Sequence, residues 1–260
     1  MEHFALTGAT VYTSPTEEPL RDAAVLINDG RIAAVGSRIV AQLPPAAAVL
    51  DCSGLTITAG FWNSHVHFFE RKWANAADIP SDEITRQMQD MLTRYGFTSA
   101  FDTGSMWKNT RLLRDRIETG AARGPRIRTT GEGIIPPGAL PPDIVINMMG
   151  AMIFPAPEAA DAAQAVAATR TLLDQGVDAI KLFASSPRSA PLPEDAIQAA
   201  VNEAHRFGKL VFIHPNSGVD VLTALRCGVD IIAHTTPHSG PWDDAIHAAI
   251  KAEEPLSRRR

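Results

Sequence analysis

Cysteine is scarce in this sequence. Only two are present in 260 residues, Cys52 and Cys227, and they lie far apart along the chain. This spacing argues against a disulfide framework or a zinc ribbon, and it makes a reducing cytoplasm the expected location. Long apolar runs are also missing, so the sequence predicts no membrane span. The N-terminus has neither the basic start nor the apolar stretch of a signal peptide, which supports the expectation of a cytoplasmic chain.

A strong charge of either sign is missing as well. The net charge is −5 at pH 7, and basic residues are spread along the chain except for Arg258, Arg259 and Arg260. We therefore expect no nucleic-acid partner, and we interpret the three arginines as a solvated tail. The apolar fraction of 45% is ordinary for a globular chain with a sizeable core. The length suits one large α/β domain, or a barrel beside a small second domain.

The first 55 residues contain short apolar segments that are typical of β-strands. Residues 23–27 and 31–35 flank Asn28, Asp29 and Gly30. An Asp-Gly pair between two apolar runs is a strong signal for a β-hairpin. Residues 1–55 are therefore predicted to form a small β-domain that leads directly into the next strand.

From residue 56 onward, predicted strands alternate with predicted helices. Four helices close on a glycine, and a short apolar strand follows each one. The polar residue that ends or nearly ends each strand comes five or six residues after the glycine: Asp102, Lys181, His214 and His234. Such alternation predicts parallel βαβ units, and a (β/α)₈ barrel keeps its active site at the carboxyl ends of its strands.

The pattern predicts six strands and six helices. The strands are expected at 56–67, 98–102, 126–131, 178–184, 209–214 and 230–235, and the helices at 81–95, 107–119, 157–175, 193–207, 217–227 and 242–251. The segment from Ile134 to Pro157 is rich in Pro, Gly and Met and is long for a connection between strand and helix. It is either a substrate-covering loop or an irregular insertion with no role.

The strand at 56–67 ends in His65-Val66-His67. Residues two apart on a strand point to the same face, so both imidazoles can reach one metal ion. Two ordinary surface or core histidines would give the same triplet. The histidines that end later strands, His214 and His234, favour a metal site because all four fall at the same end of one architecture.

Lys181 lies inside an apolar run from Ala179 to Phe183. Burial disfavours the charged amine and lowers its pKa. A neutral amine can react with carbon dioxide to give a carbamate, an anion with two oxygens that could bridge two metal ions. The alternative is a lysine at the rim that is ion-paired with Asp102.

Together these segments resemble the amidohydrolase superfamily, close to its imidazolonepropionase-like and Xaa-Pro dipeptidase-like branch. The resemblance covers nearly the whole chain and is carried by LINDGRIAAVG, TAGFWNSHVH, DAIKLFAS, VFIHP and DIIAHTTP. It implies an α/β fold in which residues 1–55 supply the N-terminal part of a composite β-sandwich. Residues 56–260 then form a TIM-type (β/α) barrel that bears metal.

The resemblance also implies a site and an activity. His65 and His67 hold one metal ion, His214 and His234 hold the other, and carboxylated Lys181 bridges them. Zinc is the usual ion in such families, although other divalent ions are compatible. Lys181 points to the dipeptidase-like side, because imidazolonepropionases resemble mononuclear enzymes without a bridging lysine. The implied reaction is hydrolysis of a carbon–nitrogen bond in a small amide, cyclic amide or dipeptide-like substrate by a metal-activated water.

One residue of the family pattern is not found. In the family an aspartate after the eighth strand takes the proton of the water, and this role is assigned neither to Asp243 nor to Asp244. We therefore expect an incomplete, C-terminally truncated barrel of about six of the eight units, with its catalytic residue unknown. Two hypotheses stay open: a metal-dependent amidohydrolase, or a truncated, catalytically inactive metal-binding fragment. Unpaired strand edges predict a homo-oligomer.

Overall fold

The structure is a computed structural model that describes residues 3–37, 47–139, 156–186, 189–236 and 243–252. The chain divides into two compact units, Met1–Phe61 and Trp62–Arg260. Each unit has a sheet system and a core of its own, and each is described separately.

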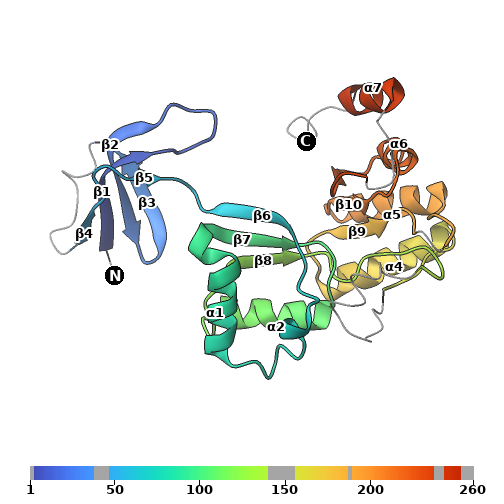
Figure 1. Ribbon diagram of the computed structural model, residues 1–260, viewed down its shortest axis with the longest axis horizontal. Coiled ribbons are helices and arrows are strands. Elements are labelled where there is room, and N and C mark those ends of the chain that lie inside the picture. The colour runs from blue at the N-terminus through green and yellow to red at the C-terminus, as the bar shows by residue number, and fades with distance from the viewer. Residues whose placement is uncertain (1–2, 38–46, 140–155, 187–188, 237–242, 253–260) are drawn as a thin grey trace. The chain divides into compact units, whose positions relative to one another are not determined.

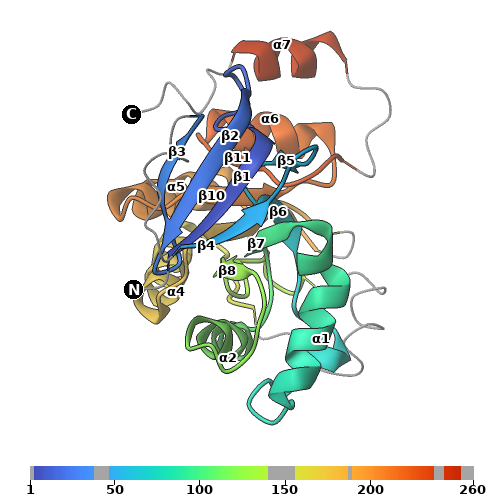
Figure 2. The same ribbon diagram turned by 90° about the vertical axis from the view of Figure 1, so that its left-hand side faces the viewer.

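The first unit is one five-stranded sheet (Figure 2). Its strands are β1 (His3–Val11), β2 (Leu20–Asn28), β3 (Arg31–Gly36), β4 (Ala48–Asp51) and β5 (Thr56–Ile57). β1, β2 and β3 are antiparallel neighbours, while β4 and β5 run parallel to β1. Asp29 and Gly30 both have positive φ, 48° and 73°, as the predicted hairpin between β2 and β3 requires. The described residues form a single sheet, so the second layer of a sandwich is not seen among them.

The second unit carries two parallel sheets of three strands each (Figure 1). The first contains β6 (Phe61–Val66), β7 (Phe97–Asp102) and β8 (Arg126–Thr129). The second contains β9 (Ile180–Phe183), β10 (Val211–His214) and β11 (Ile231–Ile232). All six predicted strands of this region are present in sequence order. The predicted strand at 56–67 is wrong in one respect, because it is two strands: Thr56 and Ile57 pair with β1, and β6 begins at Phe61.

The two sheets of this unit are linked by backbone hydrogen bonds. The Asp178 N–H donates to the Thr129 carbonyl at 2.8 Å, and the Ile134 N–H donates to the Lys181 carbonyl at 2.8 Å. The order β6-β7-β8 therefore continues into β9-β10-β11, as in a parallel barrel. No closed barrel is formed by the described residues.

Helices cover both sheets (Figure 1). They are α1 (Ser81–Met91), α2 (Trp107–Glu118), α4 (Ala162–Gln175), α5 (Glu194–Arg206) and α6 (Gly218–Arg226), with short 3-10 turns η2 (Arg71–Trp73) and η3 (Thr93–Tyr95). A further helix, α7 (Asp244–Ala252), packs on α6. α4 starts five residues later than predicted, because Asp161 caps it by accepting the Gln164 N–H at 2.8 Å. α1 stops at Met91, and the predicted last turn is η3 instead.

Two apolar clusters lie between helices and sheets. Ile84, Met88 and Leu113 from α1 and α2 pack with Ile127 of β8. Leu172, Ile197 and Val201 from α4 and α5 pack with Ile180, Leu182, Val211 and Ile213 of the second sheet. Because each sheet has its own cluster of buried side chains, the strand ends are held firmly where the polar residues emerge.

A repeated Gly-Val-Asp sequence fixes how two strands start. Asp178 accepts the Thr129 N–H at 3.0 Å, and Asp230 accepts the Val211 N–H at 2.8 Å. Asp178 also accepts from Arg114 and Arg128. Both carboxylates thus tie the start of one strand to its neighbour, which sets the relative height of the strand ends.

Some predicted features lie outside the described residues. Most of the loop from Ile134 to Pro157 is one of them, since residues 140–155 are not described, and the end of the chain from 253 onward is another. The predicted role of this loop in covering the substrate therefore stays a prediction. Among the described helices, none combines the length and apolarity that crossing a membrane would need.

Candidate metal centre

The structure brings the four predicted histidines together at the carboxyl ends of the strands in the second unit. His65 lies in β6, His67 follows β6, His214 ends β10, and His234 follows β11. The rings of His65 and His67 are 5.1 Å apart, those of His214 and His234 are 4.2 Å apart, and those of His65 and His234 are 5.6 Å apart, all between centroids. The result is two pairs of imidazoles side by side.

The first pair faces nitrogen to nitrogen. Nε2 of His65 lies 3.2 Å from Nε2 of His67. On the far side of each ring, Nδ1 of His65 lies 3.0 Å from the Ala233 carbonyl oxygen, and Nδ1 of His67 lies 3.0 Å from the Gly104 carbonyl oxygen. A carbonyl oxygen only accepts hydrogen bonds, so we infer that both Nδ1 atoms carry the proton. Two unprotonated Nε2 atoms then face each other.

The second pair is arranged in the same way, except that His214 presents Nδ1 and not Nε2 to its partner. Nδ1 of His214 lies 2.6 Å from Nε2 of His234, whose own Nδ1 is 2.7 Å from the Thr235 carbonyl oxygen. Nε2 of His214 lies 3.2 Å from Oδ1 of Asn216. Oδ1 also only accepts, so we infer that the His214 proton is on Nε2 and that its Nδ1 is bare. Again two lone pairs point at each other.

Burial keeps three of these rings, His65, His67 and His214, neutral at pH 7. Burial lowers the pKa of His67 to about 4 and that of His214 to about 3, and burial also lowers the pKa of His65. Within the His65–His67 pair, a shared proton therefore does not relieve the repulsion between the facing lone pairs. Neutral imidazole nitrogens with their other N–H tied to an oxygen are typical of zinc ligands, so the donor chemistry fits a metal ion.

Lys181 lies in β9 and is 1% exposed. Burial lowers the pKa of its amine to about 7, while the charge of Asp102 opposes that shift. Within the described parts of the chain the amine has no hydrogen bond or ion pair, and it lies 5.4 Å from the centroid of the Phe183 ring. The alternative of an Asp102–Lys181 ion pair is therefore not seen.

Asp102 is instead fully buried in a network of its own. Its carboxylate accepts from the hydroxyls of Ser105 at 2.7 Å, Thr129 at 2.9 Å and Thr110 at 3.2 Å, and from the Gly104 N–H at 3.4 Å. Ser105 also accepts the N–H of Phe68, the residue after His67, at 2.7 Å. Asp102 thus joins β7, β8 and α2 to the segment that carries His67.

Sequence reasoning missed most of this supporting set, including Gly104, Asn216 and Ala233. Backbone carbonyls leave no signal in a sequence. Asn216 follows His214 by two residues, and that spacing is the one available sign. Within the described residues, no three side chains of His, Cys, Asp or Glu are arranged around a single metal position. The histidines form two pairs instead.

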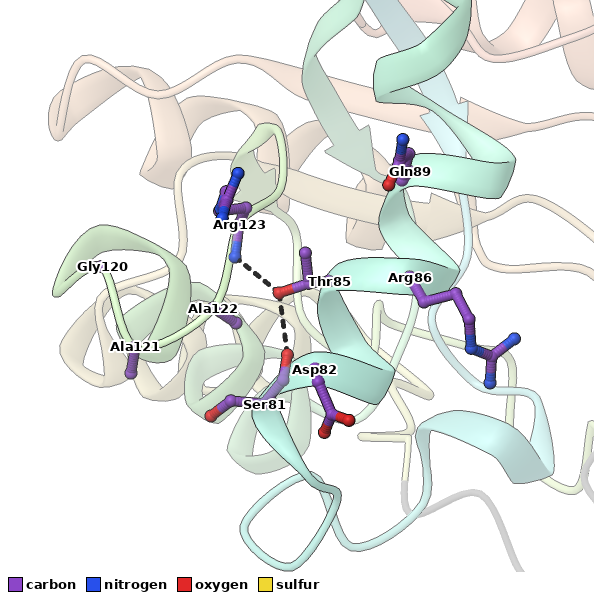
Figure 3. Close-up of a pocket in the computed structure, with 9 residues that line it drawn as sticks. All are labelled: Ser81, Asp82, Thr85, Arg86, Gln89, Gly120, Ala121, Ala122 and Arg123. Carbon is purple, nitrogen blue, oxygen red and sulfur yellow. Dashed lines mark hydrogen bonds between the residues drawn. The ribbon is translucent and has the colours of Figure 1, made fainter.

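A separate pocket of about 480 Å³ lies between α1 and the segment after α2 (Figure 3). Its wall is held by Thr85, whose hydroxyl donates to the Ser81 carbonyl and accepts the Arg123 N–H. The side chains of Asp82 and Arg86 along it are exposed. It contains none of the four histidines, and it lacks the convergent buried groups of an active site.

Comparisons with known proteins give no family profile and no curated protein that matches the chain. Solved structures do match. An amidohydrolase is 27% identical, covering 88% of this chain and 60% of that one with a TM-score of 0.67. A candidate prolidase from Bifidobacterium longum is 26% identical, covering 96% and 57% with a TM-score of 0.71. A prolidase complexed with N-methylphosphonate-L-proline is 26% identical, covering 95% and 64% with a TM-score of 0.68.

The fold of the chain is thus similar to that of amidohydrolases. The solved structures that resemble this chain are amidohydrolases and prolidases, which supports the amidohydrolase superfamily that its motifs predicted. It spans between 57% and 64% of the length of the three structures named above.

The Asp102 network gives a test of the fold around the site. Burial raises the pKa of Asp102 to about 6, against the hydrogen bonds that lower it. Between about pH 4 and pH 6 the folded chain therefore binds the proton more strongly than the unfolded chain. Stability from this group is complete below about pH 4 and is lost as the pH rises through about 6. We expect the unfolding free energy of the metal-free chain to fall by about 2 kcal/mol over that range, relative to Asp102→Asn.

Urea unfolding at several pH values measures this difference. Asp90→Asn, at an exposed position of α1, is the matched control and should follow the parent chain. Parallel curves for the parent and Asp102→Asn would contradict the expected titration.

Proposed function

We propose that this chain is a metal-dependent hydrolase of carbon–nitrogen bonds in small amides, cyclic amides or dipeptide-like molecules. The observation that carries the proposal is the arrangement of four imidazoles as two pairs with facing lone pairs. Such pairs repel each other unless a cation lies between them. The likeness to solved structures supports the class of reaction, since these include an amidohydrolase and a prolidase.

The proposed ligands are the five residues predicted from the sequence. His65 and His67 would hold one ion, His214 and His234 a second, and Lys181 would bridge them as a carbamate formed with carbon dioxide. Zinc suits imidazole nitrogens, and other divalent ions are compatible. When bound, such an ion polarises a carbonyl and lowers the pKa of a coordinated water.

The chain itself orients the rings and limits water around them. The Nδ1–H groups of His65 and His67 donate to fixed carbonyl oxygens, so neither ring can rotate without losing a hydrogen bond. Phe69 packs on His67 with centroids 4.9 Å apart, and Phe183 packs on His214 at 5.2 Å. These apolar rings lower the local polarity beside the ligands, which strengthens electrostatic interactions there.

A second candidate is a metal-binding chain without hydrolase activity of its own. One observation favours it: among the described residues, no carboxylate forms a hydrogen bond with any of the four imidazoles. Asp102 is engaged by four other donors, and Asp243 accepts the Ile246 N–H at 2.9 Å. A general base contributes about 10²–10⁴ in rate, so turnover separates the two candidates.

The first prediction from this proposal concerns metal content. Purified protein should carry about two zinc or similar ions per chain. His65→Ala/His67→Ala and His214→Ala/His234→Ala should each lose about one, because each removes one pair of donors. Elemental analysis measures the ratio, and turnover of a dipeptide and N-acyl amide panel by the loaded protein is assayed alongside.

The matched control is His205→Ala, which removes an exposed histidine bonded to Asp230 outside the cluster. Equal metal in the parent and both double variants would show that the histidines are not ligands. Full metal content without turnover would favour the second candidate.

The second prediction concerns the lysine. If Lys181 forms a carbamate, metal loading should depend on bicarbonate, and Lys181→Ala should lose metal. Lys181→Arg should not restore it, since a guanidinium stays protonated and cannot form a carbamate. Lys108→Ala, an exposed lysine of α2, is the control. Loading of Lys181→Arg to the level of the parent would rule the carbamate out.

We propose further that the chain self-associates. Among the described residues, β6 pairs only with β7 and β11 only with β10, which leaves an open edge on each sheet. Trp62 lies on the β6 edge and is 51% exposed. Light scattering after size exclusion should show a smaller mean mass for Trp62→Lys than for Tyr95→Lys, which alters an exposed aromatic residue away from the edges. Identical masses for both variants and the parent would refute the role of this edge.

A further inference from the structure

His214 differs from the other three histidines in what fixes its ring. His65, His67 and His234 each place one nitrogen against a backbone carbonyl oxygen. His214 places Nε2 against a side chain, at 3.2 Å from Oδ1 of Asn216. It is also the one ring of the four that presents Nδ1, not Nε2, to its partner.

The orientation of the Asn216 amide is determined by its neighbours. Its Nδ2 donates to the Ser185 carbonyl oxygen at 2.8 Å and lies 3.3 Å from the Ser185 hydroxyl. A carbonyl oxygen cannot donate, so the amide nitrogen must be on that side. Oδ1 is therefore directed at His214, where it can accept a proton but cannot supply one.

Asp220 fixes the positions of Asn216 and Ser185 through hydrogen bonds. Its buried Oδ2 accepts the Asn216 N–H at 2.8 Å, the Ser217 N–H at 3.0 Å and the Ser185 hydroxyl at 2.7 Å. Asp220 also belongs to the capping box of α6, in which its own N–H donates to the Ser217 hydroxyl. The end of β9, the end of β10 and the start of α6 thus meet at one carboxylate.

We propose that Asn216 is a positioning residue that sets the tautomer of His214 and so selects Nδ1 as the nitrogen that binds metal, and that Asp220 holds Asn216 in place. The proposal rests on the proposed function, because it assigns a task within the same metal centre. Without the Asn216 acceptor, the Nε2 proton loses its partner, and the ring can present either nitrogen.

The test uses cadmium as the probe. The full chain, with ¹⁵N-labelled histidine, is loaded with ¹¹³Cd²⁺, and cadmium–nitrogen coupling in NMR spectra identifies the ring nitrogen that binds. In the parent we expect coupling to Nδ1 of His214. In Asn216→Ala we expect that coupling to be lost or divided with Nε2, and the cadmium affinity to fall by about 10–100-fold, as is typical when a partner of a metal ligand is removed.

Two variants sharpen the result. Asn216→Asp keeps an oxygen acceptor for the Nε2–H of His214 and should restore the Nδ1 coupling. Asn202→Leu, at an exposed position of α5, is the control and should match the parent. Circular dichroism checks that each variant is folded, and Asn216→Ser replaces Asn216→Ala if the latter is not.

The outcomes are distinct. Coupling through Nδ1 with unchanged affinity in Asn216→Ala would overturn the positioning role while leaving the metal centre intact. Coupling through Nε2 of His214 in the parent would overturn it as well. A parent chain that binds no cadmium would overturn the proposed function, and this inference with it.

Discussion

The candidate site depends on a simple property of carbonyl oxygen, which accepts hydrogen bonds and cannot donate them. Each of the four imidazoles has one nitrogen against such an oxygen: a main-chain carbonyl for His65, His67 and His234, and the Asn216 amide for His214. This assigns the proton on every ring and leaves the other nitrogen bare. The bare nitrogens are then brought within 3.2 Å and 2.6 Å of each other in two pairs. Two unprotonated nitrogens that face each other repel in the chain alone, and they are the arrangement that binds a cation.

Two buried carboxylates keep that arrangement in place. Asp102 ties β7, β8 and α2 to the segment after His67, and Asp220 ties the ends of β9 and β10 to α6. Each accepts several hydrogen bonds, so its desolvation is offset by its partners. Hydrogen bonds outside the site thus hold the histidines in place, which is common where a fold must keep polar residues in a fixed geometry.

The sequence predicted the features that arise from local patterns. The Asp29-Gly30 hairpin, the order of six strands and the placement of His214 at a strand end follow from short-range periodicity and turn chemistry. The predicted start of α4 and the single strand predicted at 56–67 were wrong. The cap decides where the helix begins, and the pairing partners decide where each strand begins and ends. Contacts such as His65 with Ala233 join residues 168 apart, and no local pattern encodes them. The role of Asp102 as a structural carboxylate needed side-chain geometry.

The contact between His65 and Ala233 also has a consequence for folding. Bringing together residues 168 apart costs chain entropy, which the segments between them must first offset by folding. The local strand–helix units can form early, whereas the full set of imidazoles exists only when the first and last strands of the second unit have met. A ligand that binds the complete set selects the fully folded chain over every partly folded one, so its binding energy adds to the stability of the whole unit.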